Sequence, residues 1–130
     1  MILALQTDAA EARVMIIGPG GEVMTQHTWH AHRTLARDIL TVIKDQLTTA
    51  GGDWNSLSGL ICFSGPGSFT GLRIGAAVIN TITQTNQVPV VAVNGSTWIE
   101  AGLRRLAAGE NDRVVMPTYG AAANITSPKK

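Results

Sequence analysis

Hydrophobic and polar positions alternate along the first thirty residues in the manner of short β-strands. Apolar runs at residues 2–7 and 13–18 predict two strands, and a third over residues 22–30 is indicated by the alternating positions of Val23, Thr25 and His27. Glycine and proline at positions 18–21 form a turn between the second and third strands. These hairpin-like connections favour a three-stranded antiparallel meander.

The hydrophobic period changes from two to that of a helix after residue 33. Leu35, Ile39, Ile43 and Leu47 recur at helical spacing, so a helix is expected over residues 33–50, ending at a Gly-Gly pair. The rest of the chain predicts the following elements in order: a strand at 59–64, a helix at 70–86, a strand at 88–93, a helix from Ser96 or Thr97 to Ala107, and a broken strand or hairpin over 113–125 before a frayed tail. The pattern is that of an α/β domain with a mixed sheet flanked by helices.

A glycine-rich stretch joins the strand at 59–64 to the helix at 70–86. It reads Gly65-Pro66-Gly67-Ser68-Phe69-Thr70-Gly71-Leu72-Arg73-Ile74-Gly75, with Ser68 or Thr70 as the N-cap. One interpretation is a loop whose backbone N–H groups bind a phosphate at the helix N-terminus. The other rests on the four-residue spacing of Gly67, Gly71 and Gly75, which leaves one stripe of the helix bare for a second helix to approach. Neither the dinucleotide fingerprint nor the P-loop pattern fits the stretch.

The helix at 70–86 is apolar on nearly all sides. Such a helix must be covered on more than one side, and in a domain of this size the second cover is expected from another chain. Composition agrees with a compact domain, since 45% of the 130 residues are hydrophobic and 15% are charged.

Charge and cysteine content narrow the functional classes. A net charge of +1 gives no electrostatic reason for direct binding of nucleic acid or a membrane surface. Cys62 is the single cysteine, which excludes a disulfide within the chain and favours a reducing, cytoplasmic setting. The amino end reads as a strand rather than a signal peptide, and no apolar run reaches membrane-spanning length.

Several side chains could act as chemical groups, and each has a plainer alternative. His27, His30 and His32 could bind a metal, but they lack zinc-type spacing, so surface histidines are favoured. Asp8 could hold a cation, although an aspartate in a turn is the more common case.

The remaining candidates also favour binding over catalysis. Cys62 reads as a packed strand residue, and Ser68 lacks the Gly-x-Ser-x-Gly context of a nucleophile. Arg73 lies in the first turn of a helix, where the dipole disfavours a cation, so binding a carboxylate or phosphate, or an interface salt bridge, is favoured. The residues therefore indicate a binding or partner module.

The stretch from Gly65 to Gly75 resembles the signature of the TsaB (YeaZ) family at every position. The opening strand, the Gly-Glu-Val hairpin at 21–23 and the strand at 88–93 also match, so the resemblance covers residues 1 to about 108. It implies an actin-like ATPase, ribonuclease H-like fold in a single subdomain at 1–108, followed by a terminal strand or hairpin and a flexible tail at 109–130.

The resemblance implies a non-catalytic scaffold subunit. Its TsaD-like catalytic partner and a TsaE-like ATPase would make N6-threonylcarbamoyladenosine beside the tRNA anticodon, with tRNA contacted only indirectly, no metal, and ATP or ADP with magnesium only at the complex interface. The helices at 33–50 and 70–86 would build the partner interface, whose residues are expected to be Gly67, Gly71, Ile74, Gly75, Val78, Leu35 and Ile39. A nucleotide or interface loop would comprise Gly65, Pro66, Gly67, Ser68, Phe69, Thr70 and Arg73.

The chain departs from the family pattern in three places. Gln6-Thr7-Asp8 stands where the family has Asp-Thr-Ser, and residues 35–37 replace a His-Ser-Glu. The second subdomain of the family is expected to be missing, as in a minimal member, a shortened piece or a divergent paralogue. A stand-alone nucleotide-binding protein, or a homodimer that uses the glycine stripe on itself, remains the alternative to the scaffold.

Overall fold

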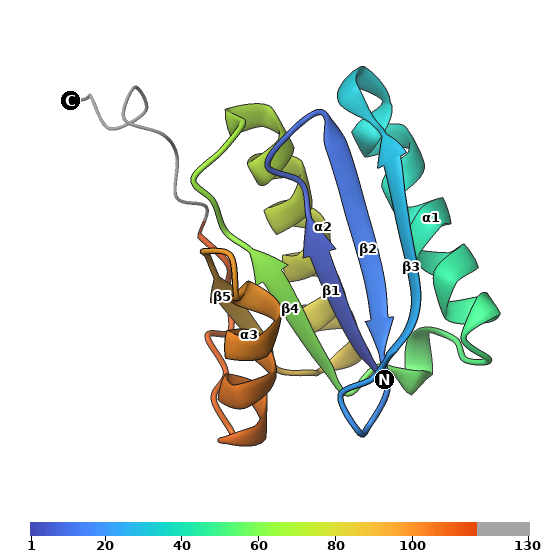
Figure 1. The fold of residues 1–130 in the computed structure, drawn as a ribbon, viewed down its shortest axis with the longest axis vertical. Helices are drawn as coiled ribbons and strands as arrows, with labels where there is room; N and C mark the ends of the chain where they lie inside the picture. The colour runs from blue at the N-terminus through green and yellow to red at the C-terminus, as the bar shows by residue number, and fades with distance from the viewer. Residues whose placement is uncertain (117–130) are drawn as a thin grey trace.

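The computed structural model of the chain describes residues 1–116, and of His32 only the backbone. Figure 1 shows a central sheet with helices packed against it. The elements follow in the order β1 (Ile2–Gln6), β2 (Glu11–Ile17), β3 (Val23–His30), the short 3-10 helix η1 (His32–Thr34), α1 (Leu35–Thr49), the 3-10 helix η2 (Trp54–Ser56), β4 (Gly59–Phe63), α2 (Phe69–Asn86), β5 (Val90–Val93) and α3 (Trp98–Ala107).

The sheet has the strand order β3-β2-β1-β4-β5. Strands β1, β2 and β3 pair antiparallel, with Leu3 opposite Ile16, and this confirms the predicted meander. Strand β4 runs parallel to β1, with Leu3 opposite Leu60, and β5 runs parallel to β4. The arrangement of a meander followed by alternating helices and strands is the one that the family resemblance implies.

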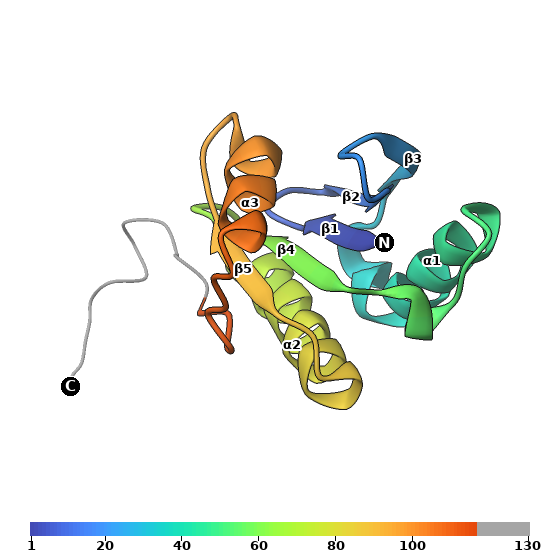
Figure 2. The same ribbon diagram turned by 90° about the horizontal axis from the view of Figure 1, so that it is seen from below.

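Strands β1, β2, β4 and β5 bury apolar side chains on both faces of the sheet and form two hydrophobic clusters, whereas edge strand β3 is largely exposed. Helices α1 and α2 cover one face and α3 covers the other, as Figure 2 shows from below. Alternation along β4 separates the two sides, because Leu60 and Cys62 belong to the cluster under α1 and α2, whereas Ile61 and Phe63 belong to the cluster under α3.

Part of the second cover of α2 comes from its own chain. The side chain amide of Asn80 donates to the carbonyl oxygen of Val115 at 3.2 Å and accepts from its N–H at 2.7 Å. Val115 is 2% exposed and belongs to the core cluster of α1 and α2. Another chain was expected to supply this cover. The part of α2 beside Asn80 is instead covered by residues of the same chain, because the segment after α3 folds back onto α2.

The segment after α3 does not form the predicted strand over 113–116. Instead, side chains close the outer edge of β5: Asn111 Oδ1 accepts from the N–H of Val90 at 3.1 Å, and Asp112 Oδ2 accepts from the N–H of Ala92 at 2.8 Å. Residues 111–115 therefore pack onto the same sheet and core as residues 1–108. The remainder of the predicted strand or hairpin, and the tail, lie outside the described residues.

Arg105 of α3 fastens this segment in place. Its guanidinium donates to the carbonyl oxygen of Ala92 at 2.9 Å, to Glu110 Oε1 at 2.6 Å and to Asp112. Burial of Asp112 opposes its ionisation, but the hydrogen bond from Arg105, together with that from the Ala92 backbone, lowers the pKa of the carboxyl.

The pKa of Asp112 leads to a pH-dependent prediction. A carboxyl whose pKa is lower in the folded state stabilises the fold above its unfolded value of about 4, and this contribution is lost as the pH falls through the folded value. Asp112→Asn should therefore lower the free energy of unfolding at about pH 7 and cost less at about pH 3. Urea denaturation at both values measures this, with Asp45→Asn on the exposed side of α1 as the control. A cost for Asp112→Asn that is equal at both values would contradict the prediction.

Candidate functional site

The loop between β4 and α2 is held by hydrogen bonds within the chain. Ser68 is the N-cap of α2, and its Oγ accepts from the N–H of Gly71 at 3.5 Å, which confirms one of the two predicted caps. The N–H of Ser68 itself donates to the carbonyl oxygen of Asp8 at 2.8 Å. Two of the N–H groups that a phosphate would use at this helix end are therefore already bonded.

The glycine stripe of α2 faces the turn between β1 and β2. A Cβ on Gly67 would lie 2.5 Å from the Cβ of Asp8, one on Gly71 would overlap the carbonyl oxygen of Thr7, and one on Gly75 would overlap the Thr7 hydroxyl. The same hydroxyl donates to the carbonyl oxygen of Gly71 at 2.8 Å. The prediction that these three glycines form a partner interface is corrected, since their bare stripe already receives the chain's own backbone.

Two further residues of the predicted interface belong to the core. Leu35 is 4% exposed and Ile39 is 1% exposed, and both lie on the face of α1 that packs against the sheet. They are corrected from interface to core residues, because the helical period identifies one apolar face and that face turns inward. Ile74 and Val78 of α2 are half-buried. They are the two predicted interface residues whose side chains still reach the surface.

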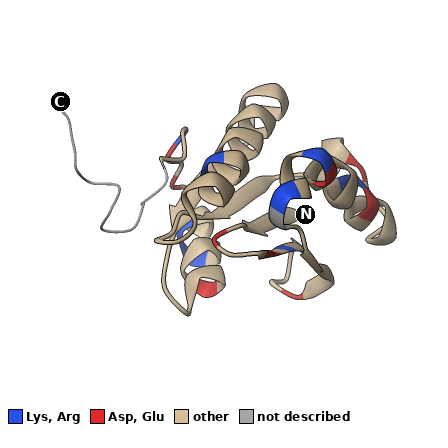
Figure 3. Cartoon of the chain, turned by 90° about the horizontal axis from the view of Figure 1, so that it is seen from above, with Lys and Arg blue, Asp and Glu red and all other residues tan. Residues whose placement is uncertain are grey.

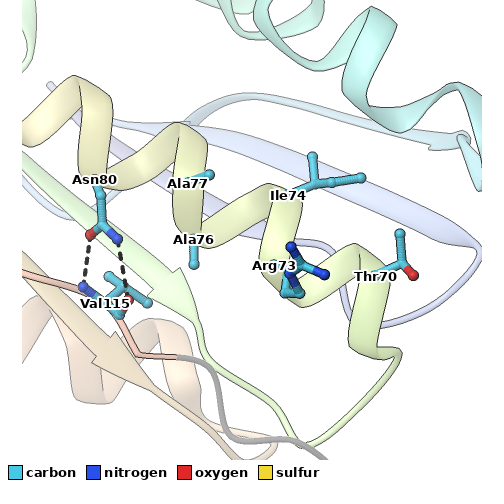
Figure 4. A pocket seen from close by; sticks show the side chains of 7 residues that line it. All are labelled: Thr70, Arg73, Ile74, Ala76, Ala77, Asn80 and Val115. Atoms are coloured by element: carbon cyan, nitrogen blue, oxygen red, sulfur yellow. Dashed lines mark hydrogen bonds between the residues drawn. The ribbon is translucent and has the colours of Figure 1, made fainter.

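An open groove lies along the outer side of α2. It holds about 520 Å³ and is lined by Thr70, Arg73, Ile74, Ala76, Ala77, Asn80 and Val115. Figure 4 shows Asn80 turned toward Val115, with Ile74 on the opposite side of the helix. Small alanines leave room between these side chains, so the groove can receive an apolar group.

The amino end of α2 adds an aromatic ring and a cation beside the groove. Phe69 is 48% exposed, and the guanidinium carbon of Arg73 lies 5.1 Å from the centroid of its ring. Arg73 takes part in none of the ion pairs within residues 1–116, which join Arg37 to Asp38 and Arg105 to Glu110 and Asp112. An exposed ring covered by a cation outside any ion pair can contact an apolar surface and a carboxylate together.

The other candidate groups are not assembled into a reactive site. Cys62 lies in the core, and burial raises the pKa of its thiol to about 12, so it stays protonated near neutral pH. The His27 ring stacks on Trp29 with their centroids 5.8 Å apart. Within the described part of the chain, no group of three or more His, Cys, Asp or Glu side chains could hold a metal ion.

Charged side chains do not gather on one surface of residues 1–116 (Figure 3). Figure 3 shows charged residues of both signs dispersed over the helices and turns. Among residues 1–116, no helix is long and apolar enough to cross a membrane.

Sequence reasoning missed the groove and the link between Asn80 and Val115. One signal was available, since Asn80 is a polar residue that directly follows the apolar run at residues 74–79 near the centre of the helix. A polar side chain at such a position needs a hydrogen-bonding partner, but the sequence does not say that the partner lies 35 residues away.

Comparison with known families and structures agrees with this fold. The family described as "TsaD: tRNA N6-adenosine threonylcarbamoyltransferase" matches residues 25–112, more than half of the chain. YeaZ from Pseudomonas aeruginosa has a TM-score of 0.67 and 30% identity over 72% of this chain and 43% of its own. A second structure, described as an uncharacterized protein with similarity to peptidase YEAZ from the same organism, has the same TM-score and identity.

Two curated relatives carry the same name. The tRNA threonylcarbamoyladenosine biosynthesis protein TsaB of Haemophilus influenzae is 29% identical over 85% of this chain and 46% of its own length. That of Escherichia coli K12 is 30% identical over 87% of this chain and 51% of its own length. The chain thus spans about half the length of the curated relatives it matches. The family model matches, the actin-like, ribonuclease H-like fold is shared with YeaZ, and the Gly65–Gly75 signature is intact. The chain therefore belongs to the TsaB (YeaZ) family.

Proposed function

We propose that this chain is a scaffold subunit in the biosynthesis of N6-threonylcarbamoyladenosine in tRNA and that its partner binds over the outer side of α2. The observation that carries the proposal is the groove beside Phe69 and Arg73, which exposes apolar surface and a cation outside any ion pair of residues 1–116, on the helix that follows the family signature. Apolar and aromatic groups around a cation are typical of protein interfaces.

The partner that fits this role is a TsaD-like catalytic subunit, with a TsaE-like ATPase joining through the complex. We infer that tRNA is contacted mainly through these partners, since the net charge of +1 offers little attraction for phosphates. ATP or ADP with magnesium would bind at the complex interface, and the complex would work in the cytoplasm.

A non-catalytic role is supported by the state of the two nucleophile candidates. Cys62 is held protonated by burial, and the Ser68 hydroxyl oxygen accepts the N–H of Gly71 at the start of α2. A phosphate-binding role for the Gly65–Thr70 loop has less support for a similar reason, because the N–H groups of Ser68 and Gly71 are bonded within the chain. The proposal therefore assigns the chemistry to the partner.

Ala77→Arg tests the partner surface. Ala77 is exposed on the groove, so a long charged side chain there should fill the groove while leaving the fold intact. We expect co-purification with the TsaD-like partner to fall by at least about tenfold, which corresponds to about 1.4 kcal/mol. Co-expression of tagged variants followed by quantitative pull-down measures this.

Ala107→Arg is the matched control. It makes the same substitution at an exposed alanine in the last position of α3, on the opposite face of the sheet. Retention of the partner by Ala107→Arg and its loss by Ala77→Arg, with equal thermal unfolding of both, supports the proposal. Undiminished pairing of Ala77→Arg would place the partner elsewhere.

A further inference from the structure

The loop between β5 and α3 carries the dipeptide Asn94-Gly95. Both residues are exposed, and residues 94–97 form neither helix nor strand. Within residues 1–116, neither the side chain of Asn94 nor the N–H of Gly95 has a hydrogen-bonding partner. The backbone of Gly95 lies in the left-handed region, with a φ of 87°. A side-chain amide and the backbone nitrogen that follows it are therefore both free at the surface.

Asparagine followed by glycine is the pair in which these two groups react with least hindrance. The nitrogen of the following residue attacks the side-chain carbon Cγ and closes a five-membered imide ring. Glycine favours this step because it has no Cβ beside the attacking nitrogen and its backbone adopts many conformations. A nitrogen or a side chain that is held in a hydrogen bond must first break that bond, which slows the reaction.

The other four asparagines of residues 1–116 are restrained by hydrogen bonds. Three have side chains that bond to backbone groups elsewhere in the chain, namely Asn80, Asn86 and Asn111. The fourth, Asn55, is followed by Ser56, whose N–H donates to the carbonyl oxygen of Asp53 at 3.0 Å. In this part of the chain, Asn94 is thus the asparagine at which both reacting groups are unbonded.

Both ends of the loop are anchored, so the fold can accept a change between them. The carbonyl oxygen of Val93 accepts from the N–H of Ser64 at 2.8 Å and from its hydroxyl at 3.2 Å. The carbonyl oxygen of Thr97 accepts from the N–H of Ala101 at 3.0 Å. Thr97 is the N-cap of α3 and makes no side-chain cap bond. The helix dipole does not oppose a negative charge ahead of this helix end.

We propose that Asn94 is a modification site at which the chain converts its own side-chain amide to a carboxylate. The nitrogen of Gly95 gives up its proton and bonds to Cγ of Asn94, and the side-chain nitrogen leaves as ammonia. Water then opens the imide ring. Breaking the bond from Cγ to nitrogen gives aspartate, and breaking the bond from the backbone carbonyl carbon gives isoaspartate.

The overall change is the same for both products, since one water is consumed and one ammonia is released. Each product lowers the net charge of the chain from +1 to 0. The reaction needs no group from another molecule besides water. Asn94 does not line the α2 groove, so the modification is independent of whether the groove binds the proposed partner.

Comparison of the folded and unfolded chain tests this site. The full-length protein is incubated at mildly alkaline pH in buffer and in concentrated guanidinium chloride, and peptide mapping by mass spectrometry measures conversion at each asparagine. Asn94 should convert in the folded chain within about threefold of its unfolded rate, since no bond has to open. Folding should slow Asn55 and Asn111 by at least about tenfold. Equal slowing at all three positions, or no conversion of Asn94, overturns the proposal.

Asn94→Gln is the matched control. It keeps an exposed amide at the same position, but its additional methylene prevents closure of the five-membered ring. Ion-exchange chromatography should show an acidic form that accumulates at least about tenfold faster in the wild type than in this variant, because the other asparagines are restrained by folding. Circular dichroism of the separated acidic form should give the melting curve of the wild type, since both ends of the loop stay anchored. Equal accumulation in the two proteins, or an unfolded acidic form, contradicts the assignment.

Discussion

Replacing Gly71 with alanine is expected to destabilise the domain by about 3 kcal/mol, although alanine is the better helix former by about 1 kcal/mol. The added Cβ would overlap the carbonyl oxygen of Thr7. A backbone atom in the turn after a buried strand cannot move aside as a flexible side chain can, so α2 must shift away from the sheet. Urea denaturation measures the change in the free energy of unfolding.

A second glycine provides the control for this prediction. A Cβ on Gly20 would approach the Glu22 carboxylate at 3.1 Å, and that exposed side chain can rotate away at the cost of one exposed hydrogen bond from the N–H of Gly20. Gly20→Ala should therefore leave the stability within about 0.5 kcal/mol of the wild type. If Gly71→Ala were as stable as the wild type but lost its protein partner, the glycine stripe would be an interface after all. That result would refute the packing of α2 on Thr7.

Replacing Asn80 with leucine is expected to cost about 2–4 kcal/mol, because the N–H and the carbonyl of Val115 both lose their partner. Leucine is apolar and a better helix former than asparagine, so a loss of stability reports the two hydrogen bonds at 3.2 and 2.7 Å rather than helix propensity. Val115 belongs to the core, so its release would also open one wall of the α2 groove. Thermal and urea unfolding measure the stability, and a pull-down measures the expected fall in partner binding.

Gln84→Leu is the matched control on the same helix. It makes the same amide-to-apolar change at an exposed position one turn beyond Asn80. We expect an effect within about 0.5 kcal/mol and no loss of the partner. Equal stability of the two variants would show that Val115 does not depend on Asn80.

The sequence by itself determined the elements and most of their limits. Local signals suffice for these, because a strand period of two, a helical period of 3.6 and the cap at Ser68 depend on residues near one another in the chain. The meander, the helices ending at Thr49, Asn86 and Ala107 and the burial of Cys62 follow from such signals. The unbroken match from Gly65 to Gly75 indicated the family in the same way, because a contiguous motif depends on neighbouring residues alone.

Only the tertiary structure decided what lies against each face. A four-residue spacing shows that Gly67, Gly71 and Gly75 share a stripe, but the atoms that fill it belong to Thr7 and Asp8, about 60 residues earlier in the chain. In the same way, the apolar period of α1 marks Leu35 and Ile39 as one face without saying whether a partner or the sheet covers it.

The segment after α3 was predicted to be a strand for the same reason. Instead, Val115 packs against α2, and the side chains of Asn111 and Asp112 bond the edge of β5. Periodicity records how a segment is oriented about its own axis. The neighbour it meets is set by packing between distant segments, which leaves no periodic trace in either one.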